Sequence, residues 1–218
     1  MPRRSDVSPE ETRTRIIDAA AEVFASRGFA SSSLEEITAA AGFSRGAFHW
    51  HFDSKKDLLL AVLRSRLDAA TTSKDQLVAA AGHPGAFNRA QRQRAGSRQR
   101  AAMRQWVLLM MEFWLQAARD PDLAPAAAEL KERLRVATAR QVDGLAQTAG
   151  LELPLPSRTI ASALMALDDG FALQELLDPT ITSDTLWDVV DYLTATLANS
   201  PPSAGASAAE PFEGPPTS

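Results

Sequence analysis

Apolar side chains recur at intervals of three and four residues through most of the chain, which is the spacing of one helix face. The stripes stop at glycines and prolines, which commonly end helices. This pattern predicts an all-α protein. The expected helices cover residues 9–27, 34–41, 45–52, 55–80, a stretch that includes 103–114, 125–149, 157–177 and 183–198.

The stretch around Gly42 predicts two short helices joined by a tight turn. Ser33 can cap the first helix, and Glu36, three positions later, can complete a capping box. Gly42 can adopt the positive φ that ends this helix, and Ser44 can cap the next one. We therefore expect a helix-turn-helix unit over residues 33–52.

The second of these helices has a composition that core packing alone does not require. Phe48 and Phe52 are four residues apart and can share a buried face. The basic and aromatic side chains that fall on the remaining surface are Arg45, His49, Trp50 and His51. A helix that enters the DNA major groove needs such side chains. A plain helical hairpin, with Trp50 and the histidines in the core, also fits the pattern.

Two runs of residues carry a family resemblance. The segments TRTRIIDAAAEVFASRGFA and SLEEITAAAGFSRGAFHWHFDSKKDLL resemble the DNA-binding domain of the TetR (tetracycline repressor-like) family. The resemblance implies an all-helical homodimer, with an N-terminal three-helix helix-turn-helix domain and a C-terminal helical domain for ligand binding and dimerisation. The base-facing or backbone-facing positions that it implies are Arg45, Gly46, Ala47, His49, Trp50 and His51.

The same resemblance implies a phosphate contact from Lys55, which begins the next helix. The helix caps Ser33 and Ser44 complete the residues that we expect at the DNA surface. His49 stands where the family usually has tyrosine, so we expect its contact to depend on pH, because histidine changes charge near neutrality.

Four segments are expected along the chain: a flexible arm, a helix-turn-helix domain, a helical ligand-binding and dimerisation domain, and a disordered tail. Their predicted bounds are residues 1–7, 8–54, 55–199 and 200–218. The tail contains five prolines, with many alanines and serines, a composition typical of disorder. The helix that begins at Lys55 reaches from the DNA-binding domain into the second domain, and we expect it to couple them.

Aromatic residues and methionines surround the helix that includes residues 103–114, which predicts a fully buried helix. These side chains could line a ligand pocket or form a plain core. The candidate pocket residues are Phe87, Met103, Trp106, Met110, Phe113 and Trp114. Glu112 and the adjacent Asp168 and Asp169 are possible polar anchors, although exposure to solvent is the simpler expectation for all three.

The last two helices carry more apolar surface than one monomer can easily cover. Their stripes contain Ile160, Leu164, Leu167, Phe171, Trp187, Val190, Leu193 and Leu197. The resemblance implies that these helices form a four-helix bundle in a homodimer.

The net charge of −4 is unusual for a DNA-binding protein, so the distribution of charge matters more than the sum. Residues 1–66 contain ten basic and nine acidic side chains, and the rest of the chain contains thirteen and eighteen. DNA binding must therefore depend on the placement of a few cations. The most basic segment, residues 87–104, has six arginines and no acid. We expect a solvated loop followed by the first turns of a helix there, with a second nucleic-acid contact as the alternative.

The sequence gives little support for an enzyme, a metal-binding protein or a membrane protein. The chain has no cysteine, no apolar run long enough to span a membrane, no glycine-rich phosphate loop and no H-E-x-x-H motif. We expect a cytoplasmic protein without enzymatic activity, cofactor, metal or membrane contact.

The sequence thus predicts a ligand-responsive transcriptional regulator, most simply a repressor. It would bind a palindromic operator in double-stranded DNA as a homodimer and be released by a small, largely apolar effector. The alternative is a ligand-binding or protein-interaction module whose helix-turn-helix does not bind DNA specifically. Salt-insensitive association without DNA would distinguish that alternative.

Overall fold

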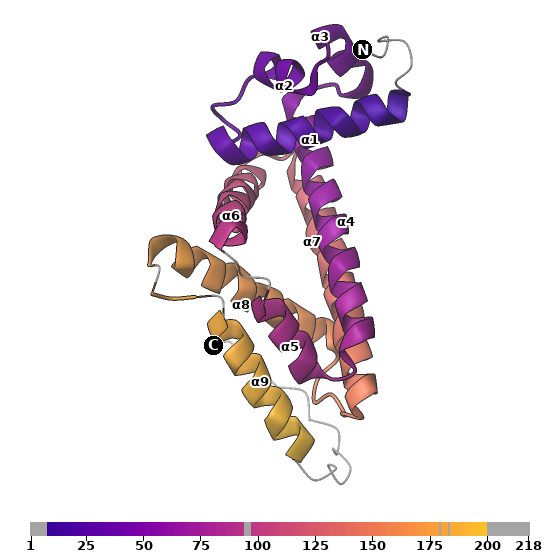
Figure 1. Ribbon diagram of the computed structural model, residues 1–218, viewed down its shortest axis with the longest axis vertical. Helices are drawn as coiled ribbons and strands as arrows, with labels where there is room; N and C mark the ends of the chain where they lie inside the picture. Colours follow the sequence, from indigo (N-terminus) through magenta and orange to yellow (C-terminus); the bar gives the residue numbers. More distant parts are fainter. Residues whose placement is uncertain (1–7, 94–96, 179, 183, 200–218) are drawn as a thin grey trace, which may run out of the picture.

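The computed structural model describes residues 8–93, 97–178, 180–182 and 184–199, and within this part every regular element is a helix (Figure 1). The predicted all-α fold class is confirmed. The helices are α1 (Pro9–Arg27), α2 (Leu34–Ala41), α3 (Arg45–His51), α4 (Lys55–Ala81), α5 (Pro84–Gln93), α6 (Ser97–Ala117), α7 (Ala124–Ala149), α8 (Ser157–Leu177) and α9 (Asp184–Asn199). The predicted arm and tail lie outside the described residues.

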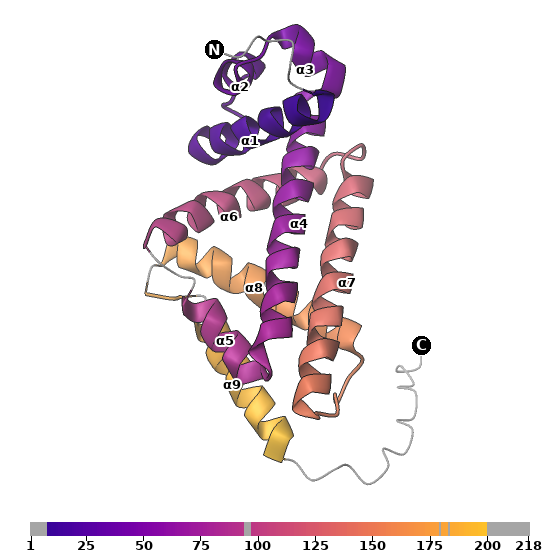
Figure 2. The same cartoon turned by 45° about the vertical axis from the view of Figure 1, so that its right-hand side comes forward.

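Helices α1, α2 and α3 form a unit at one end of the elongated molecule, around the N-terminal end of α4 (Figure 1). Helix α6 passes beneath α1, and α8 crosses below α6 (Figure 2). Helices α5 and α9 pack together near the other end of the molecule. This arrangement places the helix-turn-helix unit away from α8 and α9.

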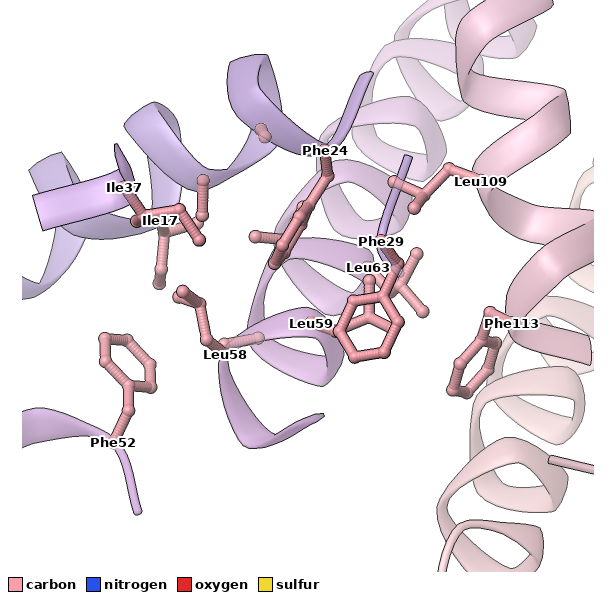
Figure 3. Packing of buried hydrophobic residues seen from close by; sticks show 14 of the residues in the cluster. Ile17, Phe24, Phe29, Ile37, Phe52, Leu58, Leu59, Leu63, Leu109 and Phe113 are labelled. Atoms are coloured by element: carbon pink, nitrogen blue, oxygen red, sulfur yellow. The ribbon is translucent and has the colours of Figure 1, made fainter. Parts of the chain in front are cut away.

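One hydrophobic core joins the helix-turn-helix unit to the rest of the protein. Phe24 in the last turns of α1 and Phe29 just after this helix pack with side chains of α4 and with Leu109 and Phe113 of α6 (Figure 3). Phe24 and Phe113 are each 1% exposed. The core is thus continuous across the predicted boundary at residues 54 and 55, so motion of α6 can be transmitted to α1.

Helices α4 and α7 lie side by side and run in the same direction (Figure 2). Three ion pairs link them, between Arg64 and Glu129, Asp68 and Arg133, and Asp75 and Arg140, with N···O distances of 3.1, 2.6 and 2.6 Å. The partners advance together along both helices with a constant separation of 65 residues. This ladder aligns α4 with α7 at one register.

Helix α5 corrects the expectation of a loop at the start of the basic segment. The helix begins at Pro84, and Phe87 and Asn88 are 5% and 1% exposed. Arg92 forms ion pairs of 2.8 Å with Asp188 and with Asp191 of α9. The loop prediction was wrong for residues 87–93 because the helix is stabilised by α9, about a hundred residues away in the sequence.

Helix α6 corrects the expectation of full burial. Met103, Leu108 and Leu115 are 53%, 43% and 55% exposed, whereas Leu109 and Phe113 are buried. The helix packs on α1, α7 and α8 but leaves one side uncovered in the monomer. Although apolar side chains occur all round α6, only part of its circumference is therefore covered by other helices.

Candidate nucleic-acid interface

The helix-turn-helix is built by the local signals that the sequence contains. The hydroxyl of Ser33 accepts a hydrogen bond from the N–H of Glu36 at 3.2 Å, and the Glu36 carboxylate accepts one from the N–H of Ser33 at 3.0 Å. Gly42 ends α2 with φ 75°, a conformation that favours glycine. Ser44 then caps α3 by accepting a hydrogen bond from the N–H of Ala47 at 3.2 Å. The predicted capping box, turn and second cap are confirmed.

The inner side of the unit is fixed by aromatic rings and by two arginines of α1. Phe48 is fully buried and Phe52, which follows α3, is 2% exposed. The guanidinium of Arg13 lies 5.0 Å from the centre of the Phe52 ring, and that of Arg15 lies 4.8 Å from the Phe43 ring. These cation–π contacts were not predicted from the sequence. The feature that could have indicated them is the pair of arginines two residues apart on α1.

The outer side of α3 exposes four of the predicted DNA-binding residues, Arg45, Gly46, His49 and Trp50, which we call the exposed α3 face. Trp50 is 73% exposed, so the alternative that placed this residue in the core is wrong. Ala47 and His51 are half-buried, and the rings of Trp50 and His51 meet edge to face, 5.0 Å apart. The exposed α3 face presents donors, an acceptor and a flat apolar surface, the groups that base edges and phosphates recognise.

Arg45 is held by a neighbouring acid. Its Nη1 donates a hydrogen bond of 2.8 Å to Oε1 of Glu35 on α2, and both side chains are about two-thirds exposed. An exposed ion pair of this kind contributes little to stability. Its consequence is positional, because it keeps the guanidinium beside the start of α3.

Lys55 points into the protein, whereas the sequence predicted a phosphate contact. Its Nζ donates hydrogen bonds to the carbonyl oxygens of Phe29 at 2.6 Å and Ser32 at 2.7 Å, and it lies 4.5 Å from the centre of the Phe29 ring. A phosphate contact requires this ammonium to leave those carbonyls, so the contact stays a prediction. In the observed state Lys55 ties the start of α4 to the α1–α2 loop (residues 28–33).

The neighbouring Lys56 is also engaged. Its Nζ lies 2.5 Å from Oδ2 of Asp120, which follows α6. The hydrogen bond between the two side chains lowers the pKa of Asp120 and raises the pKa of Lys56. Lys55, which the sequence placed at the DNA surface, and its neighbour Lys56 are therefore both bonded to other parts of the protein.

Glu112 makes an interdomain contact that no sequence pattern indicated. Its two carboxylate oxygens accept hydrogen bonds from the N–H groups of Phe29 and Ala30, at 3.1 and 3.2 Å. The acid comes from the C-terminal half of α6, and the amides belong to the α1–α2 loop. We call this contact the Glu112 clasp. Glu112 is thus bonded to backbone amides and also lies on the wall of a surface cleft, so its role as a polar anchor stays a prediction.

Comparison with protein families assigns both parts of the chain. Residues 16–62 match the model described as "Bacterial regulatory proteins, tetR family". Residues 94–199 match the model described as "BetI-type transcriptional repressor, C-terminal". The chain belongs to the TetR family. The resemblance inferred from the helix-turn-helix residues is confirmed.

Curated HTH-type transcriptional regulators match about a third of the chain. The transcriptional regulator SrpR of Pseudomonas putida is 50% identical over 66 residues, which cover 30% of this chain and 31% of SrpR. The regulator TtgR, also of Pseudomonas putida, is 40% identical over 83 residues, which cover 35% of this chain and 40% of TtgR. The chain spans about a third to a half of the length of the first such relatives, at 31%, 49%, 40% and 40%.

Solved structures with the same fold cover most of the chain. A transcriptional regulator from Saccharomonospora viridis, in complex with choline, has a TM-score of 0.64 and 21% identity over 85% of this chain and 96% of its own. A TetR-family regulator from Mesorhizobium loti has a TM-score of 0.66 and 22% identity over 88% of this chain and 97% of its own. These likenesses establish the TetR fold in both domains.

The residues predicted for the pocket of this TetR-family protein lie in three different environments. Met110 and Phe113 are in the core shared with the helix-turn-helix, and Trp106 and Trp114 pack against that core. Phe87 instead meets Trp187, with ring centres 5.9 Å apart. Met103 is 53% exposed. The structure therefore brings four of the six together.

Neither of two surface clefts in the described part of the chain is lined by any of those six residues. The larger cleft, about 560 Å³, lies beside the Glu112 clasp, between the α1–α2 loop and the end of α6, with Leu115 and Arg119 on its wall. The smaller, about 330 Å³, lies along α4 and α7. The predicted pocket stays a prediction.

Asp169, one of the two predicted polar anchors on α8, is bonded to a lysine of α7. Asp169 accepts a hydrogen bond of 2.6 Å from Nζ of Lys131 on α7, and this ammonium also lies 4.5 Å from the centre of the Trp114 ring. Lys131 thus connects α6, α7 and α8. Trp114 and Asp169 contact the same ammonium group. The sequence did not predict this, because the two residues are far apart along the chain.

The residues predicted for the dimer interface are partly exposed on α8 and α9. Leu167 is 41% and Leu193 is 50% exposed, and Val189 and Tyr192 beside them are 39% and 72% exposed. Trp187 differs, because it packs on Phe87 within the same chain. The other predicted residues, Ile160, Leu164, Phe171, Val190 and Leu197, are half-buried.

The described residues contain no group of three or more acidic or histidine side chains arranged to hold a metal ion. In the same part of the chain, no helix combines the length and the apolar character that crossing a membrane requires.

Proposed function

We propose that this TetR-family protein is a ligand-responsive transcriptional repressor that binds a palindromic operator as a homodimer. The observation that carries the proposal is the exposed α3 face, where a capped helix presents Arg45, His49 and a 73%-exposed Trp50 to solvent. An indole in this position gains nothing for the folded monomer, because burial of its apolar surface would be more favourable. A nucleic acid is the partner that the neighbouring basic groups favour.

Dimerisation is supported by the apolar side chains that α8 and α9 leave uncovered. Contiguous exposed apolar surface commonly marks a protein interface. In a two-fold dimer the same surface of each copy meets its counterpart, so α8 and α9 of two chains would form a four-helix bundle. Two α3 helices would then lie about 34–36 Å apart, one turn of duplex DNA.

The effector is proposed to be a small, largely apolar molecule bound near Trp106, Met110, Phe113 and Trp114. Helix α6 carries all four side chains and also carries Glu112, so a ligand there can act on the helix-turn-helix. Choline is a sensible first probe, because the similar Saccharomonospora viridis regulator was solved in complex with choline and aromatic side chains favour quaternary ammonium groups. Larger apolar compounds form the second set of probes.

Selection of bound duplexes from a random pool tests this function. Purified full-length protein is mixed with the pool, the retained duplexes are sequenced, and the best one is titrated with salt. An enriched inverted repeat, with affinity that falls steeply as salt rises, is the expected result. Failure to enrich any duplex at low salt would contradict the proposal. An affinity for the duplex that does not change with salt concentration would also contradict it. The enriched operator then serves to screen probes for release.

A further inference from the structure

We propose that Glu112 is the positioning residue through which the C-terminal domain sets the orientation of the helix-turn-helix, so that opening the Glu112 clasp releases the operator. This inference rests on the proposed function. It concerns regulation of the same DNA-binding surface, and it identifies one side chain as the point where the two domains are coupled.

The two hydrogen bonds of the Glu112 clasp restrict the orientation of the α1–α2 loop relative to α6. Glu112 uses both oxygens, one on the N–H of Phe29 and one on the N–H of Ala30, at 3.1 and 3.2 Å. Hydrogen bonds to a charged acceptor are stronger than neutral ones, and a two-oxygen contact also fixes an angle. The apolar contacts of Phe29 with Phe113 and Leu109 hold the domains together, but burial of apolar surface has little angular preference. Glu112 therefore defines the angle at which α1 meets α6.

The loop that Glu112 holds is also fixed from the opposite side. The carbonyl oxygens of Phe29 and Ser32 accept the 2.6 and 2.7 Å hydrogen bonds from Lys55. The α1–α2 loop thus gives its N–H groups to α6 and its carbonyl groups to the start of α4. Because Ser33, the cap of α2, comes directly after it, displacement of this loop moves the helix that supports α3.

The position of Glu112 on α6 makes it responsive to events in the C-terminal domain. It lies between Met110 and Trp114, two of the proposed effector contacts. Helix shifts of about 1–2 Å are typical of allosteric transitions, and such a shift would lengthen hydrogen bonds of 3.1 and 3.2 Å beyond useful range. The cleft of about 560 Å³ beside the clasp gives the carboxylate room to leave the amides without unpacking Phe113.

The test compares full-length wild type with Glu112→Gln, which keeps the shape of the side chain but removes the charge and one acceptor. Binding is measured on three duplexes: the selected palindrome, the same half-sites with the centre changed by two base pairs, and a single half-site. We expect Glu112→Gln to bind the palindrome about tenfold more weakly, to discriminate less between the two spacings, and to bind the half-site within about twofold of wild type. Amide exchange at Phe29 and Ala30 should accelerate.

Two further variants separate orientation from folding. Glu112→Asp keeps the charge on a shorter side chain and should restore part of the spacing preference. Glu129→Gln removes the exposed ion pair with Arg64 and should bind all three duplexes as wild type does. Equal binding by wild type and Glu112→Gln on every duplex would overturn the inference alone, as would loss of half-site binding together with palindrome binding. Failure of wild type to bind any duplex would overturn the proposed function and this inference together.

Discussion

At the scale of single residues, side chains of the same chemical kind have different surroundings within the helix-turn-helix unit and the start of α4. Trp50 is exposed on α3, whereas Phe48, two residues earlier, is fully buried. Arg45 remains at the surface, whereas Lys55 is turned onto backbone carbonyls. The difference follows from what each side chain can reach: a lysine beside uncapped carbonyl groups satisfies them, and a helix face without a neighbouring element stays in solvent.

Removing the Trp50 indole should affect binding and leave folding intact. Trp50→Ala should weaken operator binding by about 10- to 100-fold, corresponding to ~1–3 kcal/mol for a residue that contacts a base. Its unfolding temperature should stay close to that of wild type, because the side chain is 73% exposed. Fluorescence anisotropy with a labelled operator measures the first effect and calorimetry the second. Leu155→Ala, at a 54%-exposed apolar residue between α7 and α8, is the matched control and should change neither.

Protonation of Glu36 should weaken the capping box of α2. The N–H of Ser33 lowers the pKa of the Glu36 carboxyl below its ordinary value of 4.5, with smaller contributions from the Ser33 hydroxyl and Arg27. Because the folded pKa lies below the unfolded one, the box stabilises the protein above about pH 4.5 and loses this effect as pH falls through the folded pKa. Glu36→Gln should therefore be less stable than wild type at neutral pH, with a difference that shrinks in acid. A pH-independent difference in unfolding temperature would contradict this.

At the scale of elements, α4 and α7 show how polar contacts align two long helices. The ion pairs of the ladder are exposed and individually weak. One position differs, since Asp75 also accepts a hydrogen bond of 2.9 Å from Nε2 of Gln141, a side chain only 7% exposed. The ladder thus includes one hydrogen bond from a buried side chain.

Asp75→Ala should therefore cost more stability than Asp68→Ala. The first change leaves the Gln141 amide buried without its acceptor, at a cost of ~1–3 kcal/mol. The second removes only the exposed pair with Arg133 and should cost less than ~1 kcal/mol. Urea denaturation of both variants gives the two free energies of unfolding. Equal values would show that Gln141 finds another partner, such as water.

At the scale of the whole molecule, the DNA-binding unit lies at one end, and α8 and α9 lie away from it (Figure 1). Helices α4 and α6 connect the two regions, the first by its length and the second by the shared core and the Glu112 clasp. Dimerisation through α8 and α9 would set the distance between two α3 helices. In the proposed homodimer, the surface of α8 and α9 would therefore fix the spacing on which operator binding depends.

A charge on the α8 and α9 surface should separate the copies. Leu193→Glu should give a monomer in sedimentation, because its 50%-exposed side chain would carry a charge into the proposed apolar interface. Palindrome binding should fall to the level of a single half-site. Val136→Glu, at a 46%-exposed site on α7, is the control and should remain dimeric. A dimeric Leu193→Glu protein would place the interface elsewhere.

Local signals in the sequence determined the all-α fold and the helix-turn-helix. Ser33, Gly42 and Ser44 act on backbone groups within a few residues, so their effects can be inferred without knowledge of distant elements. Helix α8 has the predicted bounds, and α7 begins one residue before them, for the same reason. The exposed α3 face followed from helical periodicity, which separates Phe48 from Trp50.

Only the tertiary structure decided the contacts between remote segments. Glu112 meets the α1–α2 loop across 83 residues, and Lys55 meets the Phe29 carbonyl across 26. Helix α5 exists because Arg92 and its neighbours pack on α9. Periodicity gives the face on which a side chain lies but not which distant element covers that face. The sequence by itself therefore determined the local architecture, and three-dimensional packing decided how the two domains are coupled.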